Sequence, residues 1–413
     1  MKEMFFLGAG ASKEAGVLIS TEMTKEIYDL INKDGRSQKS SQVIKFILGG
    51  LYFLKGSKGQ DIYQGISIEE LLNTLDLLSE RDNSELNPFI ASWHPLLNDI
   101  DLGDISDRDI DELVNCFYEP LQYSIPLNFN SNSFVTANDF SNNLRNAMQF
   151  HNNDPLKDQF QKVIRQAIGT KTTKHFISTK ELITKKLVNL IWVRDQNKIQ
   201  YLNPLIRYAS DNRLTIATLN YDNSIEYASS FLEIEVNTGL KDWYKTGRFS
   251  FDLNKLNLIK LHGSVDWSLS GPKTDEDHPL KYQEISEISL NKESISKLDP
   301  EIIFGGKNKL TAKGPFLSLL DAFKRVLEQV NSVIVIGYSF SDDHINEHFR
   351  SWINSNPDNI LTVINPFYYQ IDNSFVKELN NLGKNRLRII KEDASIGIIS
   401  YINNVDYVKE SPI

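Results

Sequence analysis

The sequence predicts an α/β fold in which a parallel sheet is covered by helices on both faces and is interrupted by a large helical insertion. Two observations lead to this prediction. In the N-terminal stretch 4–16, a short apolar run is followed by small residues and then by residues typical of a helix start. After residue 213, five short runs rich in Ile, Val and Leu each end at small or polar residues. Strands that are apolar along their whole length are typical of a parallel sheet buried on both faces.

The N-terminal stretch begins with Met4 to Leu7, which we expect to form a buried strand, and a helix is predicted from Lys13 onward. The turn between them contains only small residues, namely Gly8, Ala9, Gly10, Ala11 and Ser12. A helix start presents backbone N–H groups and partial positive charge, so this turn is a candidate phosphate cradle. Glycine at positions 8 and 10 would let the backbone approach a pyrophosphate, because a Cβ would stand in the way.

This turn departs from the usual dinucleotide-binding fingerprint. The fingerprint has a third glycine where this chain has Lys13, and Gly16 comes later. From the turn alone, a dinucleotide site and a tight strand-to-helix turn without any ligand are therefore equal alternatives.

Helical patterns follow the turn. Thr21 to Asn32 carries apolar residues at helical spacing, and residues 43–54 form another apolar stretch. Ser67 and Glu70 have the spacing of a capping box, in which each side chain accepts a hydrogen bond from the other residue's backbone N–H. A helix is therefore predicted to begin directly after Ser67.

From about residue 82 to 204, asparagine-rich loops alternate with helical segments and strand signals are scarce. Leu156 to Ile168 is one predicted helix, and a second is predicted to open at Ser178, which has Glu181 at capping-box spacing. We therefore predict a helical insertion at residues 82–204, within a nucleotide-binding domain formed by residues 1–81 and 205–413.

The five apolar runs after residue 213 are LTIATLNYD, LNLIKLHGS, EIIFGG, SVIVIGYSFSD and NILTVINPF. All five are predicted to be strands of the parallel sheet, and residues 272–300 between them are predicted to be a solvated excursion. Ligands of such sheets bind beyond the carboxyl ends of the strands, where these runs place their polar residues.

Composition limits the classes of function. The chain has 413 residues, with 45 basic and 54 acidic side chains and a net charge of −9, which argues against a protein whose main task is gripping nucleic acid. Its single cysteine, Cys116, excludes an internal disulfide and a multi-cysteine zinc site. The N-terminal apolar run is too short for a signal peptide, and no stretch reaches membrane-spanning length. We expect a soluble cytoplasmic protein.

Three strand ends carry candidate functional side chains. Asn220 and Asp222 follow one strand and, being two residues apart, are expected to point to the same side. They could hold a carboxamide or orient a water, or they could form an Asx turn that caps the next helix. His262 ends the next strand, where an imidazole is either a general base near neutral pH or a structural hydrogen-bonding group.

The run GYSFSDDHIN offers a second small-residue turn. Gly337 stands in the turn, and Ser339 and Ser341 are candidate donors or helix caps. Asp342, Asp343 and His344 are adjacent in sequence and do not share a face, so they are not expected to bind a metal.

Together, these fragments are more specific than any one of them. GAGAS with Gly16, TLNYD, KLHG, IIFGG, GYSFSD and VIN occur in this order, and the set resembles the sirtuin (Sir2) family. It is most similar to the divergent bacterial Sir2-like NADase domains of anti-phage defence systems. The resemblance covers residues 4 to about 31 and about 213 to 394, and implies a sirtuin-like, Rossmann-like sheet.

The resemblance implies roles for individual residues. Asn220 and His262 would be catalytic: Asn220 would lie with Asp222 beside nicotinamide and its ribose, and His262 would act on the ribose hydroxyls. The remaining NAD-binding residues would be Gly8, Ala9, Gly10, Ala11, Ser12, Gly16, Asp222, Gly337, Ser339 and Asn365. Asp393 and Ala394 would lie near adenine.

Departures from the family shape the functional prediction. Deacylating sirtuins carry a module with four zinc-binding cysteines, which a single cysteine cannot form, and Gly306 stands where they usually have an acidic residue. We therefore expect no zinc, and NAD⁺ hydrolysis to nicotinamide and ADP-ribose as the leading activity. A zinc-less protein deacylase or ADP-ribosyltransferase, and a non-catalytic module that senses NAD or ADP-ribose, remain alternatives.

The predicted activity implies regulation, because an unrestrained NADase would drain its own cell. By resemblance, the chain would be an effector of bacterial anti-phage defence that depletes NAD⁺ in an abortive infection. We expect a homo-oligomer that is switched on by assembly, and the resemblance to two-gene systems suggests a HerA-like ATPase partner, as in a Sir2–HerA pair. No membrane and no sequence-specific nucleic acid partner is expected.

Overall fold

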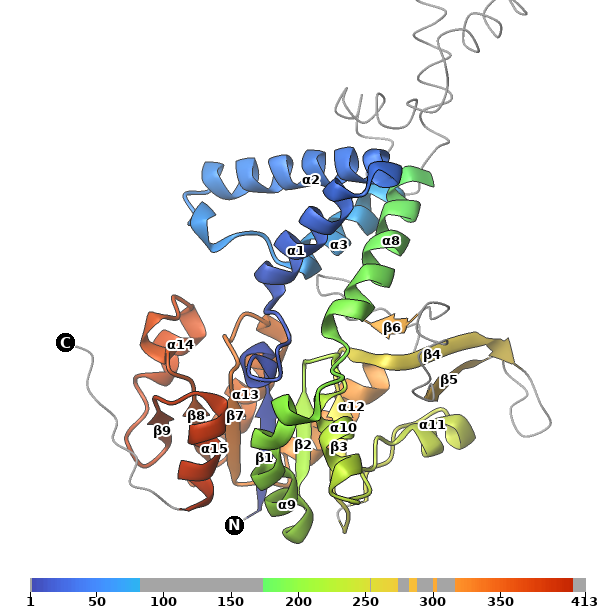
Figure 1. The fold of residues 1–413 in the computed structure, drawn as a ribbon. Helices are drawn as coiled ribbons and strands as arrows, with labels where there is room; N and C mark the ends of the chain where they lie inside the picture. Colours follow the sequence, from blue (N-terminus) through green and yellow to red (C-terminus); the bar gives the residue numbers. More distant parts are fainter. Residues whose placement is uncertain are drawn as a thin grey trace, which may run out of the picture. The chain divides into compact units, whose positions relative to one another are not determined.

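The structure is a computed structural model that describes residues 2–81, 174–252, 254–273, 282–287, 300–302 and 316–403 (Figure 1). The chain forms two compact units. The first is built from residues 1–29, 55–73 and 182–413, and the second from residues 30–54 and 74–181. Much of the predicted insertion lies outside the described residues, so its boundaries stay a prediction.

A six-stranded parallel sheet forms the centre of the first unit. Its strands, in order across the sheet, are β3 (Asn257–Lys260), β2 (Thr215–Thr218), β1 (Glu3–Leu7), β7 (Ser332–Ile336), β8 (Ile360–Ile364) and β9 (Leu387–Ile390). The strand order reverses between β1 and β7, as in Rossmann-like sheets, and ligands bind at such a switch point. The predicted α/β, Rossmann-like fold is confirmed.

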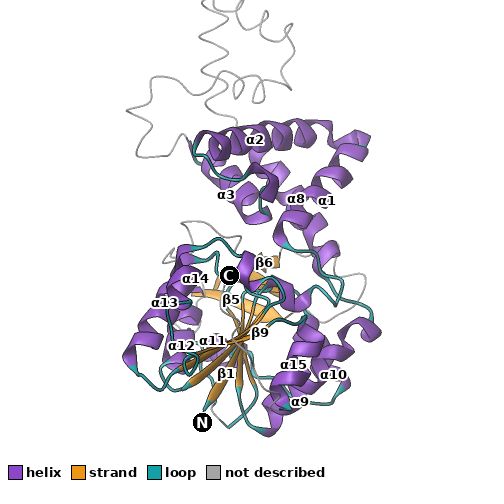
Figure 2. Cartoon of the chain, turned by 90° about the vertical axis from the view of Figure 1, so that its left-hand side faces the viewer, coloured by secondary structure: helices purple, strands orange, loops and turns teal. Residues whose placement is uncertain are grey.

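Helices cover both faces of this sheet (Figure 2). On one side lie α9 (Asn203–Asp211), α10 (Ser224–Phe231) and α15 (Ala394–Ile402), and on the other α12 (Phe316–Leu327) and α13 (Asp343–Ser355). Alternate residues of β1 serve the two layers: the Phe5 ring packs edge-on against Tyr208 and Tyr401, and the Phe6 ring against Phe349. Both phenylalanines are fully buried, which is why the strand reads as apolar at every position.

The remaining described α-helices are α1 (Ser20–Lys33), α2 (Gln38–Ser57), α3 (Ile68–Ser79), α8 (Lys174–Ile191), α11 (Leu240–Thr246) and α14 (Ser374–Leu379). The capping box before α3 is confirmed: the Ser67 N–H donates to Glu70 Oε2 at 2.9 Å, and the Glu70 N–H donates to Ser67 Oγ at 3.1 Å. The capping box predicted at Ser178 is wrong. That residue lies inside α8, and its hydroxyl donates to the His175 carbonyl, a local bond that serine makes within helices. The helix predicted at 156–168 lies outside the described residues.

The turn after β1 differs from its prediction. Residues Ala9–Ser12 form a short 3₁₀-helix, and no α-helix opens at Lys13. Gly16 has a φ of 82°, a left-handed conformation that interrupts helical geometry, and α1 begins only at Ser20. The candidate phosphate cradle is therefore the 3₁₀ turn itself rather than the N-terminus of an α-helix.

A second, three-stranded antiparallel sheet has the order β5 (Tyr282–Glu287), β4 (Gly263–Lys273), β6 (Pro300–Ile302). The EIIFGG run was predicted to be a strand of the parallel sheet. This is wrong for its first two residues, Glu301 and Ile302, which lie in β6 and pair antiparallel with β4. Residues 282–287 of the predicted solvated excursion form β5, and the solvent exposure of the excursion stays a prediction. An apolar run does not reveal its partner strand, and β4 starts a new sheet directly after His262.

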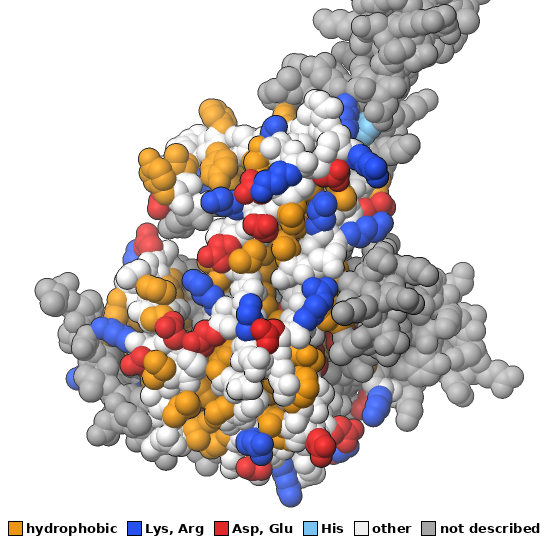
Figure 3. Space-filling model, viewed as in Figure 1, with side chains coloured by type: hydrophobic (Ala, Val, Ile, Leu, Met, Phe, Trp, Pro, Cys, Tyr) orange, Lys and Arg blue, Asp and Glu red, His pale blue; other side chains and the backbone are white. Residues whose placement is uncertain are grey.

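No helix in the described part of the chain is both long and apolar enough to cross a membrane. On the face shown in Figure 3, basic and acidic side chains are interspersed. The C-terminal part of α2 exposes Tyr52, Phe53 and Leu54, with 40, 78 and 46% of their surface accessible.

Candidate functional site

The turn after β1 is locked to the turn after β7 by backbone hydrogen bonds. The Gly8 N–H donates to the Ile336 carbonyl at 2.9 Å, and the Gly10 N–H donates to the Gly337 carbonyl at 2.8 Å. A Cβ on Gly8 would lie 2.6 Å from the Cα of Tyr338, and one on Gly10 would lie 2.9 Å from the Cα of Gly337. The two turns thus touch through backbone atoms at the switch point of the sheet.

This contact corrects the reason given for the glycines. Gly8 and Gly10 were expected to be glycine so that a pyrophosphate could approach, but a side chain there would first strike the backbone of residues 337 and 338. Gly337 is equally constrained: its φ is 62°, and a Cβ would lie 2.3 Å from the Ala11 nitrogen. These glycines therefore fix the shape of the turn, whatever it binds.

Asn220 joins this turn from β2. Its side-chain amide donates to the Gly8 carbonyl and to Ser12 Oγ, both at 2.9 Å, and its backbone N–H donates to Thr218 Oγ1 at 2.9 Å. The strand ends at Thr218, so the expected strand alternation does not extend to Asn220 and Asp222. The amide is instead directed by hydrogen bonds and stays partly exposed at the carboxyl edge of the sheet.

Asp222 is linked to Asn220 through two serines. The Asp222 carboxylate accepts the Ser224 hydroxyl and, at 3.0 Å, the Ser224 N–H, which forms an Asx turn before α10. The Ser224 Oγ lies 3.4 Å from Ser12 Oγ, and Ser12 is the hydroxyl that accepts the Asn220 amide. With 5% of its surface accessible, Asp222 is a buried member of this chain of polar contacts.

His262 lies in the short connection between β3 and β4, and only 9% of its surface is accessible. Its Nε2 lies 3.4 Å from Oδ2 of Asp342. The other oxygen of Asp342 accepts the N–H of His344 at 3.2 Å and so caps α13. The carboxylate therefore holds the imidazole from the β7 side of the sheet. Sequence reasoning missed this role, because it considered Asp342 only as a possible metal ligand.

The loop carrying Asp342 is itself strained and firmly held. Phe340 is a fully buried non-glycine residue with a φ of 56°. Its carbonyl accepts the side-chain amides of Asn346 at 2.7 Å and Asn373 at 2.8 Å. A left-handed phenylalanine is rare outside turns and costs energy, and such conformations concentrate at functional loops.

A buried charged cluster lies beneath the loop that follows β2. Lys260 Nζ donates to the Asp222 carbonyl at 2.6 Å and to Glu226 Oε1 at 2.8 Å, and only 1% of the lysine side chain is accessible. Burial raises the pKa of Glu226 to about 7; Lys260 opposes this increase and Asp266 adds to it. A carboxyl group that titrates near neutral pH therefore adjoins the site. Lys260 is the only charged residue in the apolar run LNLIKL, which was the signal available in the sequence.

We expect Glu226 to make stability depend on pH. Its folded pKa of about 7 exceeds the ordinary value of 4.5, so the folded state binds more protons between these values. The free energy of unfolding should then fall as pH rises from about 4.5 through 7, by at most about 3 kcal/mol. Chemical denaturation from pH 5 to 8 should show this slope in the wild type and lose it in Glu226→Gln. Glu235→Gln, at a side chain that is 73% exposed, is the control and should retain the slope. Parallel pH profiles for wild type and Glu226→Gln would contradict the prediction.

Tyrosine side chains support the site from the remaining elements. Tyr201 donates to the Ala11 carbonyl at 2.5 Å and so fixes the Gly8–Ser12 turn from the 3₁₀-helix Gln196–Leu202. Tyr221, next to Asn220, donates to Glu69, whose carboxylate also accepts the Ser20 hydroxyl. Burial, together with Glu69, raises the pKa of Tyr221 well above its usual value, so it remains a donor.

The remaining predicted NAD-binding residues are more exposed or make longer hydrogen bonds than Asn220 does. Ser339 is exposed, and its hydroxyl lies 3.1 Å from that of Ser341. Asn365, which follows β8, donates to the Tyr338 carbonyl at 3.4 Å. Gly16 is exposed, and the Lys198 side chain lies across it. The NAD-binding roles of these residues stay predictions.

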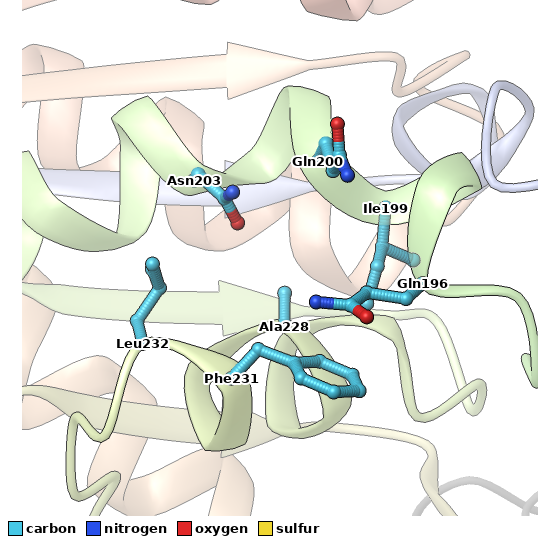
Figure 4. Close-up of a pocket in the computed structure, with 7 residues that line it drawn as sticks. All are labelled: Gln196, Ile199, Gln200, Asn203, Ala228, Phe231 and Leu232. Atoms are coloured by element: carbon cyan, nitrogen blue, oxygen red, sulfur yellow. The ribbon is translucent and has the colours of Figure 1, made fainter.

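A small pocket lies elsewhere, between the 3₁₀-helix Gln196–Leu202 and α10 (Figure 4). It has a volume of about 90 Å³ and is lined by residues such as Ile199 and Phe231. Small-molecule sites usually enclose about 300–1,000 Å³, and none of the predicted site residues lines this pocket. It is therefore not a candidate for the nucleotide. Among the described residues, no group of three or more His, Cys, Asp or Glu side chains could hold a metal ion.

Part of this chain matches the model of a known protein family. Residues 214–383 match the model of the SIR2-like domain, and no curated protein matches the chain. The matched range includes Asn220, Asp222, His262, Gly337 and Asn365. The Gly8–Ser12 turn lies before the matched range. Strand β1, which precedes this turn, lies between the matched strands β2 and β7 and so completes the same sheet.

Proposed function

We propose that this SIR2-like domain is an NAD⁺ hydrolase that releases nicotinamide and ADP-ribose. The observation that carries the proposal is the convergence of Asn220 and the Gly8–Ser12 turn at the switch point, through hydrogen bonds of 2.9 Å, within a SIR2-like sheet. His262 follows the neighbouring strand β3 and is held by Asp342. A polar amide, an imidazole and a small-residue turn at one sheet edge suit a substrate with a pyrophosphate and a reactive ribose.

Binding would use the backbone of the locked turn. The 3₁₀ turn at Ala9–Ser12 and the adjoining Gly337 would face the pyrophosphate, and Ser339 and Asn365 would contact the adenosine half. Because the glycines leave no room for side chains between the two turns, the substrate would meet a rigid surface. Rigid placement contributes to rate, because the entropy of orienting the reactants is lost before the chemical step.

The chemical step would break the bond between ribose C1′ and the nicotinamide nitrogen. The bonding electrons leave with nicotinamide, whose positive ring becomes neutral, and C1′ passes through an oxocarbenium-like state of the kind found in glycoside cleavage. A water placed by Asn220 adds its oxygen to C1′ and loses one proton. His262 would accept this proton at Nδ1 while Asp342 accepts the Nε2–H. Asp222 is buried, and it would act on the amide of Asn220 through Ser224 and Ser12.

The proposal extends to biological role and assembly. By resemblance to defence-system relatives, NAD⁺ depletion in a bacterial cytoplasm would stop phage propagation. Activation by homo-oligomer formation, with a HerA-like ATPase as partner, would protect the uninfected host. The exposed Tyr52, Phe53 and Leu54 near the end of α2 support an assembly surface, because large apolar side chains grouped on a surface favour contacts between proteins.

One experiment separates the candidate activities. Purified protein is separated by size, alone and with a HerA-like ATPase, and each fraction is incubated with NAD⁺ and, separately, with NAD⁺ plus an acetylated peptide. Free ADP-ribose and nicotinamide, produced mainly by the assembled fraction, are the expected products. An acylated ADP-ribose would indicate a zinc-less deacylase, a labelled protein would indicate an ADP-ribosyltransferase, and binding without turnover would indicate a sensor. A monomer that cleaves NAD⁺ at full rate by itself would contradict regulation by assembly.

A further inference from the structure

The buried cluster under the site contains a lysine in an unusual position. Lys260 is the last residue of β3, paired with Thr218 of β2, and its ammonium binds the Asp222 carbonyl and Glu226. Two carboxylate oxygens of the same cluster, Glu226 Oε2 and Asp266 Oδ1, are buried without a hydrogen-bond partner among the described residues. The cluster is therefore not arranged for full hydrogen-bond satisfaction.

Stability alone does not account for such a residue. Removing charged groups from water is costly, and replacing a whole buried ion pair by uncharged groups is often neutral or stabilising. Burial lowers the pKa of Lys260, but Glu226, Asp266 and Asp222 raise it by more, so the group stays charged. A permanent buried ammonium with a 2.6 Å bond to a backbone carbonyl indicates a geometric role.

The hydrogen bond from Lys260 to the Asp222 carbonyl lies at the junction of two segments, one carrying Asn220 and the other carrying His262. His262 lies between Lys260 and Val265, and both of these residues bind the loop that carries Asn220. Lys260 Nζ binds the Asp222 carbonyl at 2.6 Å, and the Val265 N–H binds the Tyr221 carbonyl at 2.8 Å. The segment that contains the imidazole is thus attached on both sides of His262 to the segment that contains the amide.

We propose that Lys260 is a positioning residue that fixes the Asn220–Asp222 loop relative to His262, and that Glu226 and Asp266 hold its ammonium in place. The proposal rests on the proposed NAD⁺ hydrolysis for its catalytic consequence, but the positioning itself is a property of the free protein. Lys260 has 1% of its side chain accessible, so it acts through Asn220 and His262 and does not touch substrate.

The test uses a pair of variants. Lys260→Met removes the ammonium but leaves two buried carboxylates without their counter-ion, and it is expected to lower the melting temperature. Lys260→Met with Glu226→Gln removes the ammonium together with the carboxylate that it contacts, and it should recover part of that loss. If Lys260 served only stability, the double variant would recover NAD⁺ cleavage together with its melting temperature. Lys241→Met is the matched control, because that lysine is 91% exposed and its ion pair with Glu235 spans 3.7 Å.

Two readouts are made on the double variant. In the active, assembled protein, kcat for NAD⁺ should stay about 100-fold below wild type while KM changes less than about threefold, since displacement by about 1 Å costs this much. In the free protein, hydrogen exchange should quicken in peptides covering residues 219–224 and stay unchanged in β1 and β7. Lys241→Met should match wild type in both readouts.

Wild-type exchange in the 219–224 peptides of the double variant would overturn the positioning role, whatever the activity. Wild-type kcat in the double variant would overturn its catalytic consequence. Absence of NAD⁺ cleavage in the wild type itself would refute the proposed function, and the exchange data would still decide whether Lys260 holds the loop.

Discussion

Replacing His262 by alanine is expected to lower kcat/KM for NAD⁺ by about 100- to 10,000-fold, the usual contribution of a general acid–base group. The imidazole lies between β3 and β4 and contacts Asp342, so its removal takes away the proposed proton acceptor without opening a gap in the main core. Nicotinamide release by assembled protein is the measurement. The melting temperature should stay close to that of the wild type.

Asn220→Ala should cause a loss of similar size for a different reason. The amide binds the Gly8 carbonyl and Ser12 Oγ, so its removal takes away the group proposed to place the attacking water and one link of the Gly8–Ser12 turn. His348→Ala is the control, because that ring lies on α13 and packs against Phe323 of α12, and it should retain activity. Full activity of both His262→Ala and Asn220→Ala would refute the assignment of these residues.

Gly337→Ala is expected to be the most disruptive single substitution. Its φ of 62° disfavours any side chain, and the new Cβ would lie 2.3 Å from the Ala11 nitrogen and 2.4 Å from the Gly10 carbonyl carbon. Both atoms belong to the backbone, so the turns after β1 and β7 would have to separate. We expect a loss of about 3–5 kcal/mol in the free energy of unfolding, in the range of the most damaging mutations, together with loss of NAD⁺ binding.

Thermal unfolding and NAD⁺ titration of Gly337→Ala test this expectation. Gly383→Ala is the matched control, since a Cβ there meets nothing within 4 Å and the residue is exposed. The control should differ from wild type by no more than about 0.5 kcal/mol. A melting temperature of Gly337→Ala within a degree of wild type would show that the two turns are not locked together in solution.

Much of the fold could be read from the sequence, because buried parallel strands leave a clear pattern. The runs at β1, β2, β3, β7 and β8 are apolar at successive positions, since helices cover both faces of the sheet. The EIIFGG run has the same composition, but its first two residues, Glu301 and Ile302, lie in β6, which pairs with β4 in another sheet. Composition reports burial and does not report the partner strand.

The sequence indicates which polar residues follow the strands of the sheet, but it does not indicate how those residues contact one another. Asn220 and His262 each follow a strand by two residues, as the sequence suggests, but sequence could not show that Asp342 approaches His262 from across the sheet. It also could not show that a side chain at Gly8 or Gly10 would clash with the backbone of residues 337 and 338. These contacts join residues more than 70 positions apart, and local patterns contain no information about them.

The central position of β1 in the sheet has a consequence for folding during synthesis. Residues 3–7 pair with residues 215–218 on one side and with residues 332–336 on the other. Chains grow from the ribosome at about 5–20 residues per second. More than three hundred residues must therefore be synthesised after β1 before β7, its second partner strand, is available for pairing. Contacts of such long range form late in folding. A nascent or truncated chain that ends before residues 332–337 therefore lacks the locked pair of turns.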